Sequence, residues 1–239
     1  MKNNLVFSLC VLVFFCFSCG SEKAKVHSLP SPEEQAKQNV ESIKELAQDG
    51  DLLVRLGDDI LSYQIKFLNE KDQSFSHAGI VFEKDNQKLV AHIAPDDSTK
   101  DNIQFIAIDS FLDTEKNLLG ALYRYNLSTE EKALVHKSIE SYHNANVHFD
   151  WHYDMATTNR MYCSEMISKA VTQATNQRIQ FRQVNVPPKM QPLLVKYFKG
   201  QLSKDTIATR KIMTIDNLYL KPECKKIVQV TLKSLPTQQ

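Results

Sequence analysis

The chain has almost no net charge, few cysteines and no hydrophobic run long enough to cross a bilayer. Its 29 Lys and Arg residues nearly balance its 28 Asp and Glu residues, so the sequence implies no global field for nucleic acid or a membrane surface. No internal repeat or low-complexity segment interrupts the 239 residues, a length that can bury a sizeable core in one domain. A substrate must therefore be recognised at a defined site.

The N-terminal residues have the pattern of an export signal. Lys2 precedes an apolar run over residues 5–17, which is shorter than the ~20 residues of a membrane-spanning helix but suits a secretory signal. A small residue followed by Cys19 ends the run and resembles the bacterial lipoprotein signal, in which Cys19 becomes the lipidated first residue. We expect an exported protein that is anchored by lipid in the bacterial cell envelope; a soluble secreted protein is the alternative. The expected organisation is a signal peptide (1–19), a tether (20–30) and one domain with an N-terminal helix (31–239).

Only two of the five cysteines, Cys163 and Cys224, lie beyond the predicted signal. An exported domain with so few cysteines is not built around disulfides. The sequence leaves open a single bridge between these two residues, which would remove Cys163 as a nucleophile. Without that bridge, we expect Cys224 to be a buried free thiol.

Hydrophobic periodicity and turn residues predict an α+β fold. Ser31 with Glu34, and Ser128 with Glu131, are spaced as capping boxes, which predicts helices that begin at residues 32 and 129. The second of these helices is expected to place Ala133, Leu134, Ser138 and Ile139 on its inner face. The other predicted elements are helices over 58–68, from 162 onward and over 191–198, and strands over 51–56, 75–82, 88–94, 103–108, 119–125 and 225–232.

Two of these strands form a hairpin whose register has a consequence for two histidines. If Glu83 lies opposite Lys88, then Gly79 lies opposite His92 and His77 is one diagonal step away on the same face. The two imidazoles can then meet. A slip of one residue would send His92 to the other face of the sheet, so the prediction depends on this register.

A cysteine near the start of a helix is the best candidate nucleophile. The segment MYCSEMI (residues 161–167) places Cys163 in the first helical turn, where unpaired amides and the helix dipole stabilise an anion, so we expect a lowered thiol pKa. A thiolate needs a base, and the base needs a third polar group that holds its tautomer. The hairpin histidines, His77 and His92, are the candidates for these two tasks.

Neighbouring residues have structural interpretations. Ala78 and Gly79 are small enough to leave room for another chain or a substrate near the histidines. Glu165 is interpreted as an acid favoured in a first helical turn rather than as a substrate contact. Three potential metal ligands lie on an irregular loop with no matching cluster elsewhere, so we expect no metal site; they are His148, Asp150 and His152.

Three segments together look like the circularly permuted branch of the NlpC-type papain-like amidases and peptidases, the YiiX/YaeF-like branch. They are GDLLV (residues 50–54), FSHAGIV (75–81) and YCSEMI (162–167), and in this branch the histidine motif precedes the cysteine helix. The resemblance extends over about residues 47–227. It implies a papain-like core of permuted topology, in which a small antiparallel sheet packs on the cysteine helix.

The resemblance also implies roles for individual residues. Cys163 matches the nucleophile and His77 its general base, while His92 stands at the third polar position, where many permuted members place Glu. The backbone amide of Cys163 would be one oxyanion donor. Tyr162 would line the acyl pocket, or it belongs simply to the core.

These roles describe a cysteine hydrolase that forms an acyl-enzyme and needs no cofactor. For an exported enzyme, peptide amides of peptidoglycan are the leading substrate class. One alternative is an amidase or acyltransferase that acts on a lipid-linked group, which the apolar loop around Trp151 would suit. Another is a non-catalytic envelope module that binds peptide or lipid on the same scaffold. No nucleic-acid partner is expected, and the sequence does not indicate an oligomeric state.

Overall fold

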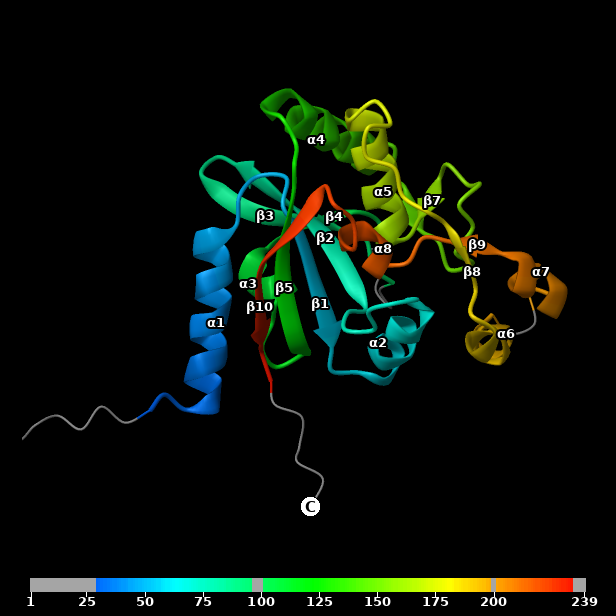
Figure 1. Cartoon of the computed structure of the whole chain (residues 1–239), viewed down its shortest axis with the longest axis horizontal. Helices are drawn as coiled ribbons and strands as arrows, with labels where there is room; N and C mark the ends of the chain where they lie inside the picture. The colour runs from blue at the N-terminus through cyan, green and yellow to red at the C-terminus, as the bar shows by residue number, and fades with distance from the viewer. Residues whose placement is uncertain (1–28, 96–100, 199–200, 234–239) are drawn as a thin grey trace, which may run out of the picture.

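The computed structural model describes residues 29–95, 101–198 and 201–233, and a single six-stranded antiparallel sheet organises them (Figure 1). The strand order is β10-β5-β1-β2-β3-β4. In chain order the strands are β1 (Leu52–Gly57), β2 (His77–Lys84), β3 (Gln87–His92), β4 (Gln104–Ala107), β5 (Asn117–Tyr125) and β10 (Cys224–Thr231). The predicted signal peptide, with Cys19 and most of the tether, lies outside the described residues.

Helices cover both faces of this sheet. They are α1 (Pro32–Leu46), α2 (Ile60–Ile65), α3 (Ile108–Phe111), α4 (Thr129–Asn144), α5 (Cys163–Ala174), α6 (Gln191–Tyr197), α7 (Lys204–Thr209) and α8 (Asp216–Tyr219). α1 and α3 share a smaller core with one face, and α4, α5 and α8 share the larger core with the other. Figure 1 shows α1 and α5 on opposite sides of the strands. The α+β prediction is confirmed.

The hairpin of β2 and β3 has the predicted register. Glu83 lies opposite Lys88, and the same register continues toward both histidines. Asp85 and Asn86 form the two-residue turn with φ angles of 52° and 60°. Two successive left-handed residues match the twist of the strands, which is why Asx residues are favoured there. Because the register holds, both histidines lie on the same face of the sheet.

Both predicted capping boxes form, and they begin α1 and α4 as expected. The inner face predicted for α4 is confirmed at Ser138 and Ile139. It is wrong at Ala133 and Leu134, which are exposed, whereas their neighbour Val135 is fully buried. Several short elements have no counterpart among the predictions: β6 (His148–Phe149), β7 (Arg160–Met161), β8 (Val184–Asn185), β9 (Lys211–Ile212), α3, α7 and α8. Elements of two to six residues carry too little periodicity to be recognised from sequence.

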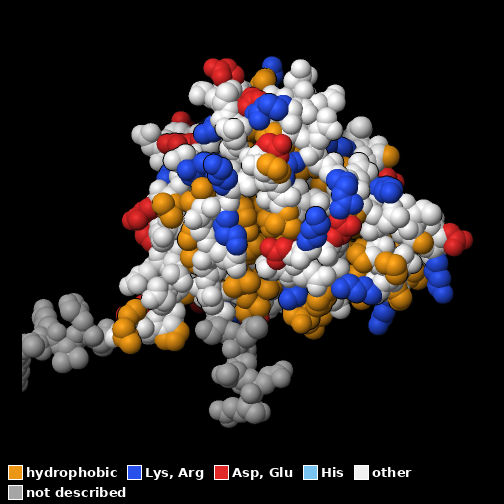
Figure 2. Space-filling model, in the orientation of Figure 1, with side chains coloured by type: hydrophobic (Ala, Val, Ile, Leu, Met, Phe, Trp, Pro, Cys, Tyr) orange, Lys and Arg blue, Asp and Glu red, His pale blue; other side chains and the backbone are white. Residues whose placement is uncertain are grey.

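The surface mixes charges of both signs. On the face shown in Figure 2, Lys and Arg side chains alternate with Asp and Glu side chains, and apolar side chains lie between them. Among the helices of the described residues, none combines the length and the apolar character needed to span a membrane.

Candidate active site

Cys163 is the first residue of α5, and its sulfur lies against the second strand. Tyr162 is the N-cap residue of this helix, so the amides of Cys163 and Ser164 have no partner within the helix. The Ser164 hydroxyl donates a 2.8 Å hydrogen bond to the carbonyl of Met213. Cys163 and Cys224 are both free and buried, so the disulfide that the sequence left open does not form. Cys163 therefore keeps a free thiol.

The two hairpin histidines meet as the register predicts. Nε2 of His77 lies 3.0 Å from Nδ1 of His92, and the two rings are nearly perpendicular, with an interplanar angle of 87°. In the described residues no hydrogen bond joins the Cys163 sulfur to either imidazole. Thiol and imidazole instead share a cavity wall.

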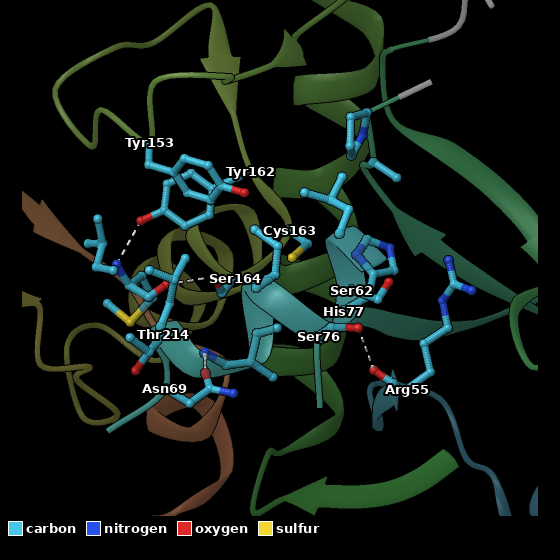
Figure 3. Close-up of a pocket in the computed structure, with 18 of the residues that line it drawn as sticks. Arg55, Ser62, Asn69, Ser76, His77, Tyr153, Tyr162, Cys163, Ser164 and Thr214 are labelled. Atoms are coloured by element: carbon cyan, nitrogen blue, oxygen red, sulfur yellow. Dashed lines mark hydrogen bonds between the residues drawn. The ribbon is translucent and has the colours of Figure 1, made fainter. Parts of the chain in front are cut away.

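That cavity is enclosed largely by apolar side chains and has a volume of about 260 Å³. Figure 3 shows the Cys163 sulfur between Tyr153 and Tyr162 on one side and His77 and Arg55 on the other. The further apolar lining residues include Leu61, Ile65, Leu68, Phe149, Ile212 and Ile215. Such a site can hold an apolar or partly polar substrate beside the thiol.

Phe111 and Arg55 lie behind the histidines. The rings of His77 and His92 each have their centroid 5.5 Å from that of Phe111, and the Arg55 guanidinium lies 5.0 Å from the same ring centre. Gly79 makes this packing possible, because a Cβ there would lie 3.3 Å from Phe111 and 2.4 Å from Cγ1 of Val90. The expectation that Gly79 leaves room for a substrate is therefore corrected: the room is filled by the core.

Burial decides the protonation of the site. It raises the pKa of the Cys163 thiol, and the nearby backbone amides of Ala78 and Ser164 oppose that rise only in part. The expected lowering of the thiol pKa by the helix start is wrong for this reason. Burial first and the Arg55 charge second hold the pKa of His77 well below its usual value, and they lower that of His92 to about 4. In the resting site, thiol and imidazoles are neutral near pH 7.

Tyr162 takes part in both the cavity and the core. Its side chain lines the cavity, but its hydroxyl accepts a hydrogen bond of 2.6 Å from the Met213 amide and donates one of 3.0 Å to the Met155 sulfur. Only the ring face is available to a substrate. A substrate-binding role remains a proposal, and it would be an apolar one.

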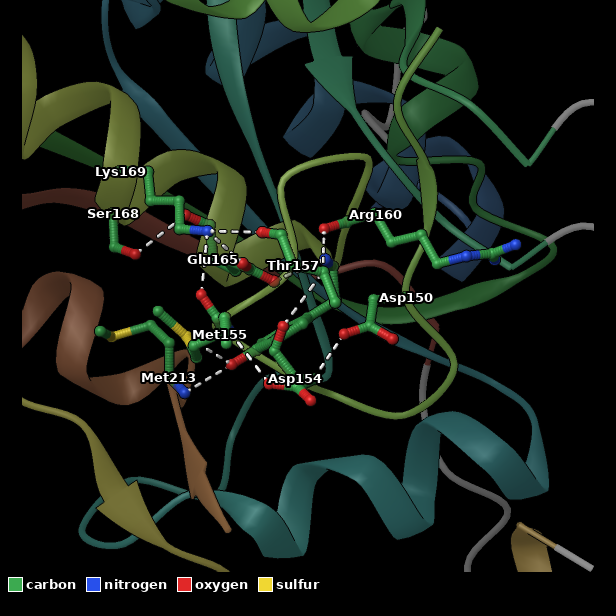
Figure 4. Close-up of polar contacts among 11 residues, drawn as sticks. Asp150, Asp154, Met155, Thr157, Arg160, Glu165, Ser168, Lys169 and Met213 are labelled. Carbon is green, nitrogen blue, oxygen red and sulfur yellow. Dashed lines mark hydrogen bonds and ion pairs between the residues drawn. The ribbon is translucent and has the colours of Figure 1, made fainter. Parts of the chain in front are cut away.

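Glu165 and Lys169 connect the cysteine helix to the loop before it (Figure 4). Glu165 is fully buried and accepts a 2.6 Å hydrogen bond from Lys169, whose ammonium also donates to the carbonyls of Met155 and Thr157. Burial raises the pKa of Glu165 to about 7, and the bond to Lys169 opposes that rise. The structural interpretation of Glu165 agrees with these contacts.

The three loop residues considered as metal ligands have separate partners. Nδ1 of His148 lies 2.7 Å from Oδ1 of Asp101, and Nε2 of His152 lies 2.9 Å from Oε1 of Gln201. The Asp150 carboxylate accepts from amides of its own loop. In the described part of the chain, no three His, Cys, Asp or Glu side chains are grouped as a metal site would require.

Sequence reasoning overlooked two features of the site. A charged residue within the apolar strand LLVRLG was the available signal for Arg55. Asp216 is buried and accepts hydrogen bonds from the amides of Glu70, Lys71 and Asp72, which fixes the segment after α2 next to the cavity. No local pattern indicates this contact, because it joins positions 144 or more residues apart.

Comparisons with known proteins agree with this geometry. A family model described as "Permuted papain-like amidase enzyme, YaeF/YiiX, C92 family" matches residues 47–216. The fold is similar to that of a solved protein whose title is "Crystal structure of metalloprotein yiiX from Escherichia coli O157:H7". The TM-score is 0.62 and the sequence identity 16%, over 77% of this chain and 97% of that chain. No curated protein matches the sequence. The architecture is thus a permuted papain-like fold.

Proposed function

The chain belongs to the permuted papain-like amidases of the YaeF/YiiX type, and from this membership we propose that it is a thiol-dependent hydrolase of cell-envelope amides. Cys163 is the nucleophile, His77 the general base and His92 the residue that orients His77. The observation that carries the proposal is the 3.0 Å contact between the two imidazoles, beside a thiol in the same cavity wall. Nucleophile, base and orienting group are the three parts that covalent catalysis by a thiol needs.

The imidazole contact assigns a tautomer to each ring. Since Nε2 of His77 faces Nδ1 of His92, His77 must carry its proton on Nε2 if its remaining nitrogen, Nδ1, is to accept the thiol proton. His92 then accepts at Nδ1 and carries its own proton on Nε2. This arrangement also stabilises the imidazolium that forms when His77 takes the proton.

The reaction begins from neutral groups. As the Cys163 sulfur bonds to the amide carbon, the thiol proton moves to His77, and the unpaired amide of Cys163 donates to the developing oxyanion. His77 then protonates the leaving amine, and a thioester remains. Water attacks the thioester with His77 as base, releases the carboxylic acid and restores the thiol. Because the thiol pKa is raised, proton transfer accompanies attack rather than preceding it.

Peptide amides of the envelope are the substrates we propose first. A lipid anchor at Cys19, which lies outside the described residues, would hold the enzyme at the membrane next to them. The apolar lining of the cavity supports the second candidate, an amidase or acyltransferase for a lipid-linked group. A binding module without turnover is the third candidate.

A resident metal does not fit the side chains at this site. The similar solved protein is called a metalloprotein in its title. Here the two imidazole nitrogens that would have to share an ion face each other at 3.0 Å, and the described residues offer no other group of ligands. No step of the proposed reaction uses a metal.

Thiol labelling tests the assignment of the nucleophile. We expect iodoacetamide to modify Cys163 much faster than Cys224 at neutral pH, because Cys163 lines the cavity and burial raises the pKa of Cys224 to about 12. Cys224→Ala is the matched control, since it should leave the fast phase intact, whereas Cys163→Ala should remove it. Equal, slow labelling of both thiols would favour the binding module.

Turnover tests the reaction itself. Purified peptidoglycan stem peptides and N-acyl amides should be compared as substrates. Cys163→Ala and His77→Ala should each abolish hydrolysis while the circular dichroism spectrum is unchanged, and Cys224→Ala should retain it. Hydrolysis of N-acyl amides alone would support the lipid-directed candidate, and full activity of Cys163→Ala would refute the mechanism.

A further inference from the structure

Arg55 is the charged group closest to the paired histidines on the sheet. It lies directly opposite His77 in the pairing of β1 with β2. Its guanidinium and both imidazoles pack on the single ring of Phe111, at 5.0 Å for Arg55 and 5.5 Å for each histidine. Three groups that can carry positive charge therefore share one aromatic ring.

Nothing that touches Arg55 in the described residues neutralises its charge. Nη1 donates a 2.7 Å hydrogen bond to the neutral side chain of Asn117, and Nε is buried without a partner. Asp59 and Asp113 act on the guanidinium only through space. A guanidinium cannot shed its proton in a protein, so this position carries a permanent charge beside the histidines.

We propose that Arg55 is a positioning residue that keeps the pair of His77 and His92 uncharged and so preserves the tautomer in which His77 can act as a base. The reason lies in the direction of the contact between the rings. A protonated His92 would present a proton on Nδ1 to Nε2 of His77, which would then have to accept it. The proton of His77 would move to Nδ1, and no nitrogen would be left to take the thiol proton.

The groups that face the two imidazoles make Arg55 the dominant charge. β1 contributes Arg55, α3 contributes the uncharged Phe111, and β4 places Gln104 opposite His92. The cavity that His77 lines is also lined by the Cys163 thiol and by Asp59, the N-cap residue of α2. Asp59 is not among the groups that shift the pKa of either imidazole. Burial lowers the pKa of both histidines, as Arg55 does. Removing the Arg55 charge should therefore raise both pKa values without returning them to the ordinary value of histidine. At an effective dielectric constant of about 20, one unit charge at a distance between ~6 and ~10 Å shifts a pKa by about 1 to 2.

The primary test follows the histidine titrations directly. In Cys163→Ala protein, imidazole nitrogen resonances are recorded by NMR from pH 8 down to the pH at which acid unfolds the protein, and they are assigned with His77→Gln and His92→Gln. Arg55→Met, which keeps an apolar stem over Phe111, should raise the titration midpoints of both rings by about one to two pH units. Arg55→Lys keeps the charge and should leave them nearly unchanged. Arg55→Gln replaces the methionine variant if circular dichroism shows that the latter does not fold.

A second experiment measures the pH dependence of kcat/KM. It rests on the proposed function, whereas the NMR titration does not. The acid limb of kcat/KM should move up by one to two pH units in Arg55→Met and stay in place in Arg55→Lys. Unchanged midpoints in Arg55→Met, or equal shifts in both variants, would overturn the role of Arg55 even if the enzyme is active. Shifted midpoints in a protein that hydrolyses no amide would keep this inference and refute only the proposed function.

Discussion

Replacing Lys169 with methionine should destabilise the protein, and by more at pH 8 than at pH 5.5. At pH 5.5 the buried Glu165 carboxyl, whose pKa is about 7, is protonated with or without its partner. The variant then loses mainly the hydrogen bonds from Lys169 to the carbonyls of Met155 and Thr157. Two such bonds contribute about 1–2 kcal/mol to the free energy of unfolding.

Above pH 7 the two proteins diverge. In the folded parent, the Glu165 carboxyl loses its proton and forms an ion pair with Lys169. In the folded variant the buried carboxyl has no cation beside it and stays protonated. In the unfolded state Glu165 is ionised in both proteins. The folded variant therefore binds one more proton than the folded parent, and its relative stability falls as pH rises. The slope is about 1.4 kcal/mol per pH unit, so the total loss should reach about 3 kcal/mol at pH 8.

Urea unfolding at pH 5.5, 7 and 8 measures these differences. Far-UV circular dichroism reports the whole domain, and the single tryptophan, Trp151, reports the loop that Lys169 holds, where its ring packs on Phe149. Glu165→Gln is the matched control, because removing Lys169 from that background should cost the same at every pH. A loss in Lys169→Met that does not change between pH 5.5 and 8, or one that persists with its pH dependence in the double variant, would refute the argument.

Three further outcomes follow from the site. Activity should persist well below pH 6.5 and fall as pH drops through the lowered pKa of His77; an acid limb of kcat/KM near 6.5 would contradict this. Gly79→Ala should cost about 1–3 kcal/mol in urea unfolding, since the new Cβ would lie 2.4 Å from Cγ1 of Val90, and an unchanged midpoint would show that the core adapts freely. Tyr162→Phe should cost about 1–3 kcal/mol, because the buried Met213 amide loses its acceptor, and the cavity shape and the labelling of the thiol should be retained. A loss of fold would assign a larger structural role to the hydroxyl.

The cysteine helix and the histidine hairpin could be predicted because their signals are local. Capping boxes and a two-residue Asx turn fix where an element begins, and the period of two along a strand fixes which face each side chain takes. From them, the sequence alone predicted the strand register and hence the meeting of His77 and His92. It also identified Cys163 at a helix start. These are properties of neighbouring residues, and neighbouring residues are what a sequence displays.

The tertiary structure alone decided the chemistry around those residues. The low pKa of the histidines depends on how deeply the two rings are buried and on a charge from another strand, Arg55. The raised pKa of the thiol depends on its burial. The same holds for Glu165, whose pKa depends on its complete burial and on Lys169. Desolvation and Coulomb terms are set by distance and exposure in three dimensions, so no pattern along the chain could have shown that the helix start would fail to lower the thiol pKa.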